Sequence, residues 1–168
     1  MLCAMVYYKQ VIKLCSEGGI KISFEIVFID DEKDLSTYID LYELSNFLHE
    51  SLKPYEDPTH EITSGVEQAL SSNAGAGGFV ALAMDGRYPV GALVMLDTHM
   101  RGFVPPNLVL YVAVSPLRRG EGIGTALLRR SIERCEGPVK LHVEYDNPAK
   151  HLYERLGFKS RYAEMRLE

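Results

Sequence analysis

The sequence predicts one α/β domain, because segments with strand periodicity alternate with segments with helix periodicity along the 168 residues. Two features support this fold class: a hairpin of two apolar runs in the middle of the chain, and a unit of strand, glycine loop and helix in the second half. The chain is 46% apolar, as in ordinary globular proteins. A chain of this length buries roughly 70% of the surface that its unfolded form exposes. We therefore expect a core that needs neither metal nor disulfide.

Charge and cysteine content exclude several function classes. Lys and Arg number 18 against 23 Asp and Glu, and the cations are dispersed except at Arg118–Arg119 and Arg129–Arg130. Nucleic-acid binding needs clustered cations, so we expect no nucleic-acid partner. The three cysteines, Cys3, Cys15 and Cys135, are scattered and form no C-x-x-C pair. This pattern predicts no structural zinc, and ordinary thiols in a reducing compartment.

Residues 1–19 form an N-terminal extension in this interpretation. The apolar run 1–6 is too short to span a bilayer and lacks the features of a cleaved signal, so we expect a cytoplasmic protein with no membrane association. Val6, Ile12 and Leu14 suggest an amphipathic helix over residues 1–17 that ends at Gly18–Gly19. This apolar segment also makes a homodimer plausible.

The first half of the domain predicts one strand, two helices and a hairpin. A β-branched and aromatic run predicts the strand, and apolar residues at helical spacing predict the helices. The glycines of residues 73–78 interrupt regular structure before the hairpin. In chain order we expect a strand over 20–29, helices over 33–50 and 59–71, and hairpin strands over 79–84 and 90–96.

The second half begins with residues 108–114, which are apolar at every position and so predict a strand buried on both faces in the centre of the sheet. No repeat or linker interrupts the chain, so residues 20–168 are expected to form a single domain. The remaining predicted elements are a helix over 122–135, a strand over 139–145, a helix over 149–156 and a last strand from 158 to near 167.

The connection after the strand at 108–114 is the most informative stretch of the sequence. It leads into a helix through Gly120, Gly122 and Gly124, preceded by Arg118 and Arg119. Glycines at a helix N-terminus let a phosphate approach unpaired N–H groups, so we expect a diphosphate site with the arginines at its rim. A Walker loop is excluded, since no Gly-Lys-Ser/Thr follows, and a dinucleotide fingerprint would need glycine where Thr125 stands.

The spacing Arg-x-x-Gly-x-Gly, after an apolar strand and Pro116, resembles the acetyl-coenzyme A signature of the GNAT N-acetyltransferase superfamily. Residues 147–158, with Asn147, Ala149, a Leu-Tyr pair and a Gly-Phe pair, look like the second motif of that family. The resemblance implies a mixed, mostly antiparallel sheet of about six or seven strands with helices on both faces. It also implies an acceptor-side half, 20–106, and an acetyl-CoA-binding half, 107–168.

The resemblance implies a set of residues that bind acetyl-CoA. The strand residues match a backbone that pairs with the pantetheine arm, the glycine loop matches one that wraps the pyrophosphate, and the last two residues match positions near the pantetheine and the sulfur. These residues are Val112, Ala113, Val114, Arg119, Gly120, Glu121, Gly122, Ile123, Gly124, Thr125, Asn147 and Tyr153. The family usually has three residues from asparagine to alanine and this chain has two, so either one residue is deleted or Asp146 takes the asparagine position.

The resemblance implies that Tyr153 is the general acid for the departing thiolate. A base must take the proton of the amine, and His142 is our first candidate because its ordinary pKa suits neutral pH, with Glu144 in reserve. A backbone N–H of the Val112 strand is the implied oxyanion donor. The glutamate of the histone-modifying branch is replaced here by Leu108.

These residues predict an acetyl-CoA-dependent N-acetyltransferase in which an amine attacks directly in a ternary complex, without a metal and without an acyl-enzyme on Cys135. The acidic balance favours a cationic small-molecule amine or a peptide amino group. Aromatic residues and histidines between residues 38 and 60 are candidates for its site. The alternative is a noncatalytic acyl-CoA-binding or regulatory module that kept the loop and lost turnover. A nucleotide-binding domain is a third reading, disfavoured by the missing metal-binding Ser/Thr.

Overall fold

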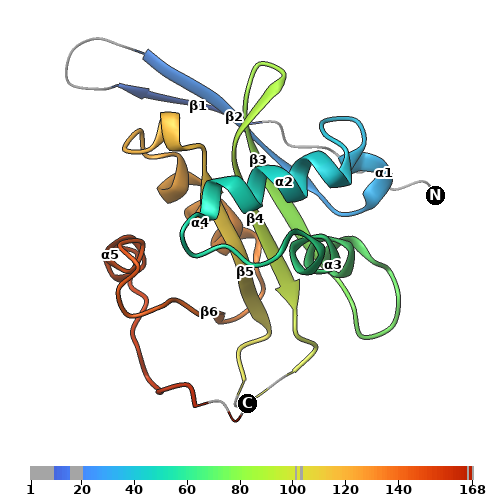
Figure 1. Cartoon of the computed structure of the whole chain (residues 1–168), viewed down its shortest axis with the longest axis vertical. Coiled ribbons are helices and arrows are strands. Elements are labelled where there is room, and N and C mark those ends of the chain that lie inside the picture. Colours follow the sequence, from blue (N-terminus) through green and yellow to red (C-terminus); the bar gives the residue numbers. More distant parts are fainter. Residues whose placement is uncertain (1–9, 16–20, 101, 103, 166, 168) are drawn as a thin grey trace.

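The computed structural model describes residues 10–15, 21–100, 102, 104–165 and 167. Its centre is one sheet whose strands follow chain order from β1 to β6 (Figure 1). Five strands pair antiparallel, and the short β6 joins β5 in parallel. The strands are β1 (Gln10–Cys15), β2 (Lys21–Ile29), β3 (Gly78–Asp85), β4 (Tyr88–Asp97), β5 (Asn107–Val114) and β6 (Val139–Leu141).

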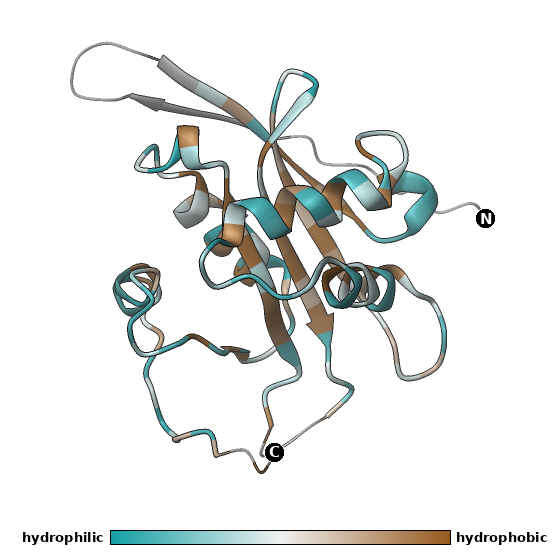
Figure 2. Ribbon diagram, viewed as in Figure 1, coloured by the Kyte–Doolittle hydropathy of each residue, from teal (hydrophilic) through white to brown (hydrophobic). Residues whose placement is uncertain are grey.

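Helices cover both faces of the sheet, as predicted. One buried apolar cluster lies under α1, α2 and α3, and a second lies under α4 and α5. The helices turn polar surfaces outward and apolar surfaces toward the sheet (Figure 2). They are α1 (Glu32–Leu35), α2 (Leu41–Leu52), α3 (Thr59–Leu70), α4 (Ile123–Arg134) and α5 (Lys150–Arg155). No helix among the described residues is long and apolar enough to cross a membrane.

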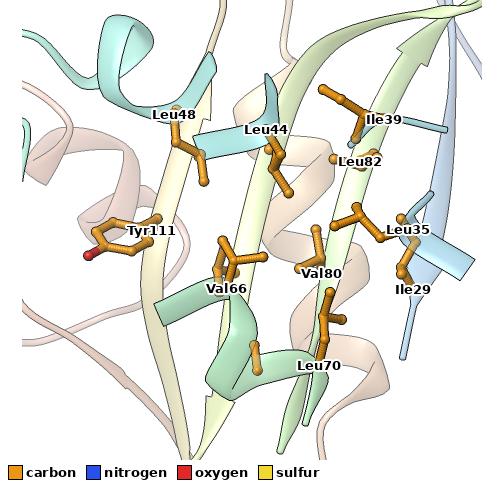
Figure 3. Packing of buried hydrophobic residues seen from close by; sticks show 14 of the residues in the cluster. Ile29, Leu35, Ile39, Leu44, Leu48, Val66, Leu70, Val80, Leu82 and Tyr111 are labelled. Atoms are coloured by element: carbon orange, nitrogen blue, oxygen red, sulfur yellow. The ribbon is translucent and has the colours of Figure 1, made fainter. Parts of the chain in front are cut away.

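Two aspartate caps explain why the single helix predicted over 33–50 is two helices. The Asp31 carboxylate accepts a hydrogen bond from the Asp34 N–H at 2.8 Å and starts α1. The Asp40 carboxylate accepts one from the Glu43 N–H at 2.7 Å and starts α2. Each cap satisfies an N–H that lacks a partner inside its helix, so a second cap begins a second helix. α2 and α3 then pack over the cluster that Figure 3 shows.

β5 contains a bulge that shapes the site described below. Val94 of β4 pairs with Tyr111, but the next residue, Met95, pairs with Val109, so Leu110 is an extra residue. Leu110 and Tyr111 consequently both pack toward the cluster under α2 and α3. Val109 and Val112, on either side of them, pack toward the other cluster. The bulge therefore aims two consecutive side chains at the same face.

Three predicted elements are wrong. The helix expected over 1–17 is contradicted at residues 10–15, which form β1, while 1–9 and 16–17 lie outside the described residues. The strand expected over 139–145 ends at Leu141, because β6 stops pairing with β5 at Val109, immediately before the bulge. The last expected strand is not formed over the described part of 158–167, where no neighbouring strand provides a ladder.

Candidate active site

The connection from β5 to α4 has the conformation of an anion cradle. Gly120 and Gly122 have φ angles of 81° and 80°, in the left-handed region that glycine adopts without strain. Gly122 caps the 12-residue helix α4 without a side-chain hydrogen bond. Within the described residues, no partner accepts a hydrogen bond from the backbone N–H groups of residues 120–125. These donors and the positive end of the helix dipole suit a diphosphate.

The two arginines before the cradle differ from the expectation that they add free charge at its rim. Arg118 forms ion pairs with Asp85 at 2.6 Å and with Glu121 at 2.7 Å. Arg119 donates from Nη2 to the Ser51 carbonyl, in the last turn of α2, at 2.8 Å. Both guanidinium groups thus have partners in the protein. They fix the loop against the β3–β4 turn and against α2, and the cradle consists of backbone amides.

An open strand edge leads away from the cradle. β6 pairs with β5 only from Asn107 to Val109, so beyond the bulge the outer edge of β5 has no strand beside it. The Ser115 N–H bonds to Val90 of β4, and backbone directions alternate along a strand. The N–H and C=O groups of Val112 therefore point to the open edge. An extended ligand chain with amide groups fits such an edge by strand-like pairing.

Tyr153 lies on the α4 side of this edge and is buried, with 9% of its surface exposed. Its ring packs edge-to-face on Phe158 with centroids 6.0 Å apart. The neighbouring Leu152 and the strand residue Val114 both lie 3.5 Å from the position of a Cβ at Gly124, so α5, β5 and the first turn of α4 meet there. Burial, and then the Glu144 carboxylate, raise the pKa of the Tyr153 hydroxyl to about 12. Tyr153 is therefore a neutral proton donor at physiological pH.

The other predicted residues of this half lie in the segment between β6 and α5. His142 and Glu144 are exposed, whereas Val143 between them packs into the cluster under α4 and α5. Among the described residues, no hydrogen bond or ion pair joins His142 to Tyr153. The Asn147 side-chain oxygen accepts a hydrogen bond from the Ala149 N–H at 2.9 Å, which starts the turn into α5. Cys135 is half-buried, and burial raises the pKa of its thiol to about 11, which does not suit a nucleophile.

The opposite face of the same edge carries a hydrogen-bonded pair that sequence reasoning missed, Tyr111 and Asp57, beside two residues from the predicted acceptor candidates, Tyr55 and His49. The Tyr111 hydroxyl donates to the Asp57 carboxylate at 3.0 Å, and the Tyr55 hydroxyl donates to the Asp146 carbonyl at 3.2 Å. His49 bonds through Nδ1 to the Asp57 carbonyl at 2.9 Å. In the sequence, a tyrosine in an otherwise aliphatic strand was the available signal for Tyr111. Among the described residues, no group of three or more metal-ligating side chains gathers.

A shallow groove of about 770 Å³ lies along the outer side of α2, toward the β3–β4 turn and Ser115–Pro116. Tyr38 and Phe47, two of the aromatic residues considered for the acceptor, line it. None of the predicted catalytic residues does. The cradle, the unpaired strand backbone and the buried Tyr153 meet instead at the open edge of β5.

An anion cradle at a helix N-terminus that continues into an unpaired strand edge has the shape and the hydrogen-bond donors that would suit a long phosphorylated ligand. The match to a family model identifies the class more closely. The chain belongs to the Acetyltransferase (GNAT) family, whose model matches residues 38–158. The matched segment includes the cradle, the open edge and Tyr153. No curated protein matches the chain.

Solved structures share this fold at low sequence identity. An aminoglycoside N-acetyltransferase, AAC(6')-Iy in complex with CoA, is 14% identical over 86% of this chain and 95% of its own, with a TM-score of 0.63. A ribosomal-protein-alanine N-acetyltransferase from Brucella melitensis is 18% identical over 86% and 99%, with a TM-score of 0.58. A transcriptional regulator from Bacillus halodurans is 20% identical over 96% and 99%, with a TM-score of 0.55. These likenesses concern the fold.

Proposed function

We propose that the protein is an acetyl-CoA-dependent N-acetyltransferase that transfers the acetyl group to a primary amine by direct attack in a ternary complex. The observation that carries this proposal is the continuity of three features: the unpartnered amides of residues 120–125, the open edge of β5, and the buried Tyr153 beside that edge. The amides would hold the pyrophosphate and the strand edge the pantetheine arm. Membership of the family supports the same assignment.

Each proposed residue has a defined part in the transfer. The Val112 N–H donates to the thioester oxygen as negative charge develops on it. A C–N bond forms, the C–S bond breaks, and Tyr153 gives its proton to the departing thiolate. The amine loses a proton to a base, for which the exposed His142 remains our first candidate and Glu144 the second. No step needs a metal or an acyl-enzyme.

The raised pKa of Tyr153 keeps its hydroxyl protonated. A phenol with a pKa of about 12 is neutral throughout the physiological range, so its proton is available whenever substrate binds. Tyr153 belongs to a buried apolar cluster with Ile123 and Leu127, and a hydrogen bond to a thiolate is stronger in such surroundings than in water. A leaving thiolate is stabilised as it forms.

The test measures free CoA released from acetyl-CoA in a panel of primary amines and peptides. We expect amine-dependent release by the wild type, and a fall in kcat of at least about tenfold in Tyr153→Phe, as for loss of a general acid. Calorimetry should give the same CoA affinity for both proteins. Unchanged kcat in Tyr153→Phe would refute the assigned role.

The same assay tests the alternative, a noncatalytic acyl-CoA-binding or regulatory module. Such a module would bind acetyl-CoA through the same cradle and release no CoA with any amine. The exposure of His142 and Glu144 is the observation that favours this alternative, because an exposed base is not held in place for proton transfer. Tight binding without turnover across the whole panel would favour the module.

A further inference from the structure

The bulge in β5 gives Tyr111 a position that a regular strand would not. It turns Tyr111 toward α3, on the face opposite Tyr153, beside the place where β6 stops pairing. Gly65 of α3 packs closely here, since a Cβ on it would lie 2.6 Å from Leu110 Cδ2 and 3.2 Å from Tyr111 Cε2. The ring is thus held firmly. Figure 3 shows its hydroxyl at the rim of the cluster, directed away from the other labelled side chains.

The hydrogen bond to Asp57 determines which further hydrogen bonds the Tyr111 hydroxyl can form. A phenol has one proton to donate and lone pairs that accept. The proton is given to the Asp57 carboxylate at 3.0 Å, so the oxygen can bind a further partner only by accepting a hydrogen bond. A backbone carbonyl can only accept, so the bond from His49 to the Asp57 carbonyl places a proton on Nδ1 and ties this loop to α2. The geometry therefore presents an acceptor for an N–H group.

The surrounding charge favours a cation. Tyr111 is faced by Asp57 from the α2–α3 loop and by Glu61 from α3, and burial and then these carboxylates raise its pKa, which keeps it neutral. Glu56, next to Asp57 in the loop, has a side-chain oxygen that is buried without a hydrogen-bond partner in the described structure. The basic side chains nearby are His49, which is bonded to this loop, Lys53, which pairs with Glu50, and His60, which lies 4.0 Å from the Glu61 carboxylate. A positively charged ligand is attracted to such a surface.

We propose that the Tyr111 hydroxyl accepts a hydrogen bond from the acceptor amine, that Asp57 positions it for this contact, and that the acceptor is an aliphatic amine, cationic in solution. The proposal rests on the proposed function and deepens it. Tyr153 serves the thiolate on one face of the open edge, and Tyr111 receives the amine on the other. An aromatic amine, which is uncharged at neutral pH, would gain nothing from the carboxylates.

The experiment titrates CoA-saturated protein calorimetrically with spermidine, kanamycin, a lysine-containing tripeptide and, as the uncharged probe, aniline. Four proteins are compared: wild type, Tyr111→Phe, Asp57→Asn, and Tyr162→Phe as the matched control, because Tyr162 is 85% exposed and lies outside the acceptor-site candidates. We expect one or more of the cationic amines to bind and aniline not to bind. Tyr111→Phe should weaken that binding about tenfold or more, and Asp57→Asn by about three- to tenfold, since each disturbs a hydrogen bond to a charged group. Tyr162→Phe should leave it unchanged.

The outcomes separate this proposal from the function it rests on. If CoA affinity is equal in all four proteins and Tyr111→Phe binds the amine within twofold of wild type, the inference is refuted and the proposed function stands. If the wild-type CoA complex binds aniline as well as the cationic amines, or binds none of them, the inference is also refuted. If the wild type does not bind CoA, both fail. Should Tyr111→Phe not fold, Asp57→Asn carries the test, because Asp57 is exposed.

Discussion

Replacing Gly120 by alanine tests whether backbone conformation builds the diphosphate cradle. Gly120 has a φ of 81°, and no atom lies within 4 Å of the place a Cβ would occupy. The substitution therefore adds no clash, and its cost is the left-handed conformation of an alanine, about 1–2 kcal/mol. If the free loop relaxes to escape that strain, ligand binding must restore it. A cost of 1–2 kcal/mol corresponds to a loss of CoA affinity of about 5- to 30-fold.

The assay is calorimetric titration with CoA, together with urea denaturation. Gly75→Ala is the matched control, because Gly75 has a φ of 84°, is equally free of neighbours within 4 Å, and lies in the loop between α3 and β3. Gly75→Ala should lose up to about 1–2 kcal/mol of unfolding free energy, whereas Gly120→Ala should lose less, because its relaxed loop escapes the strain until CoA binds. CoA affinity should fall in Gly120→Ala and stay unchanged in Gly75→Ala. Equal CoA affinity in both variants would refute the reasoning.

Three further predictions concern stability and the loop. The raised pKa of Tyr153 stabilises the fold below the ordinary tyrosine value of 10.0, and this contribution is lost as pH rises through about 12. The loss of unfolding free energy is up to about 3 kcal/mol. Urea denaturation at pH 8 and pH 11 should show a smaller loss between these two pH values in Tyr153→Phe than in the wild type. Equal losses in the two proteins would contradict this prediction. Arg118→Ala leaves the negative charge of Glu121 uncompensated beside the cradle, so calorimetry should show CoA binding about tenfold more weakly. Added salt should reduce this effect. Unchanged CoA affinity would show that the Glu121 charge does not affect binding. Gly91→Ala brings a Cβ within 2.9 Å of two α4 side chains, so the unfolding free energy should fall by about 1–3 kcal/mol. An unchanged denaturation midpoint would argue against that close packing.

The elements with a single strong pattern were predictable from the sequence. The hairpin of β3 and β4, helix α3 and the unit of β5, glycine loop and α4 are confirmed close to their expected bounds. The left-handed turns at Gly120 and Gly122 are compatible with the glycines that the sequence places after a strand, since glycine adopts positive φ without strain; the role of these residues in binding stays a prediction. The contacts that Arg118 and Arg119 make in the folded protein could not be predicted from the sequence. Their partners, Asp85 and Ser51, are distant in sequence, and only the folded chain brings them together.

The N-terminal prediction failed because residues 1–17 have no decisive period. The pairing of β1 with the long strand β2 decides the conformation of residues 10–15. The hydrogen bonds of this pairing depend on a neighbouring strand, and the local sequence of residues 10–15 does not reveal that strand. The bulge in β5 was equally hidden. Side chains reveal an extra residue by breaking the alternation of polar and apolar positions, and residues 108–114 are apolar throughout. Consequently the orientation of Tyr111 and the early end of β6 had to come from the structure.

The most direct measurement is a crystal structure of the protein with bound CoA. The account predicts phosphate oxygens within hydrogen-bond distance of the N–H groups of residues 120–125, the pantetheine arm along Val112 at the open edge of β5, and the sulfur within reach of the Tyr153 hydroxyl. CoA bound instead in the groove along α2, or a sulfur remote from Tyr153 with the cradle filled, would contradict it.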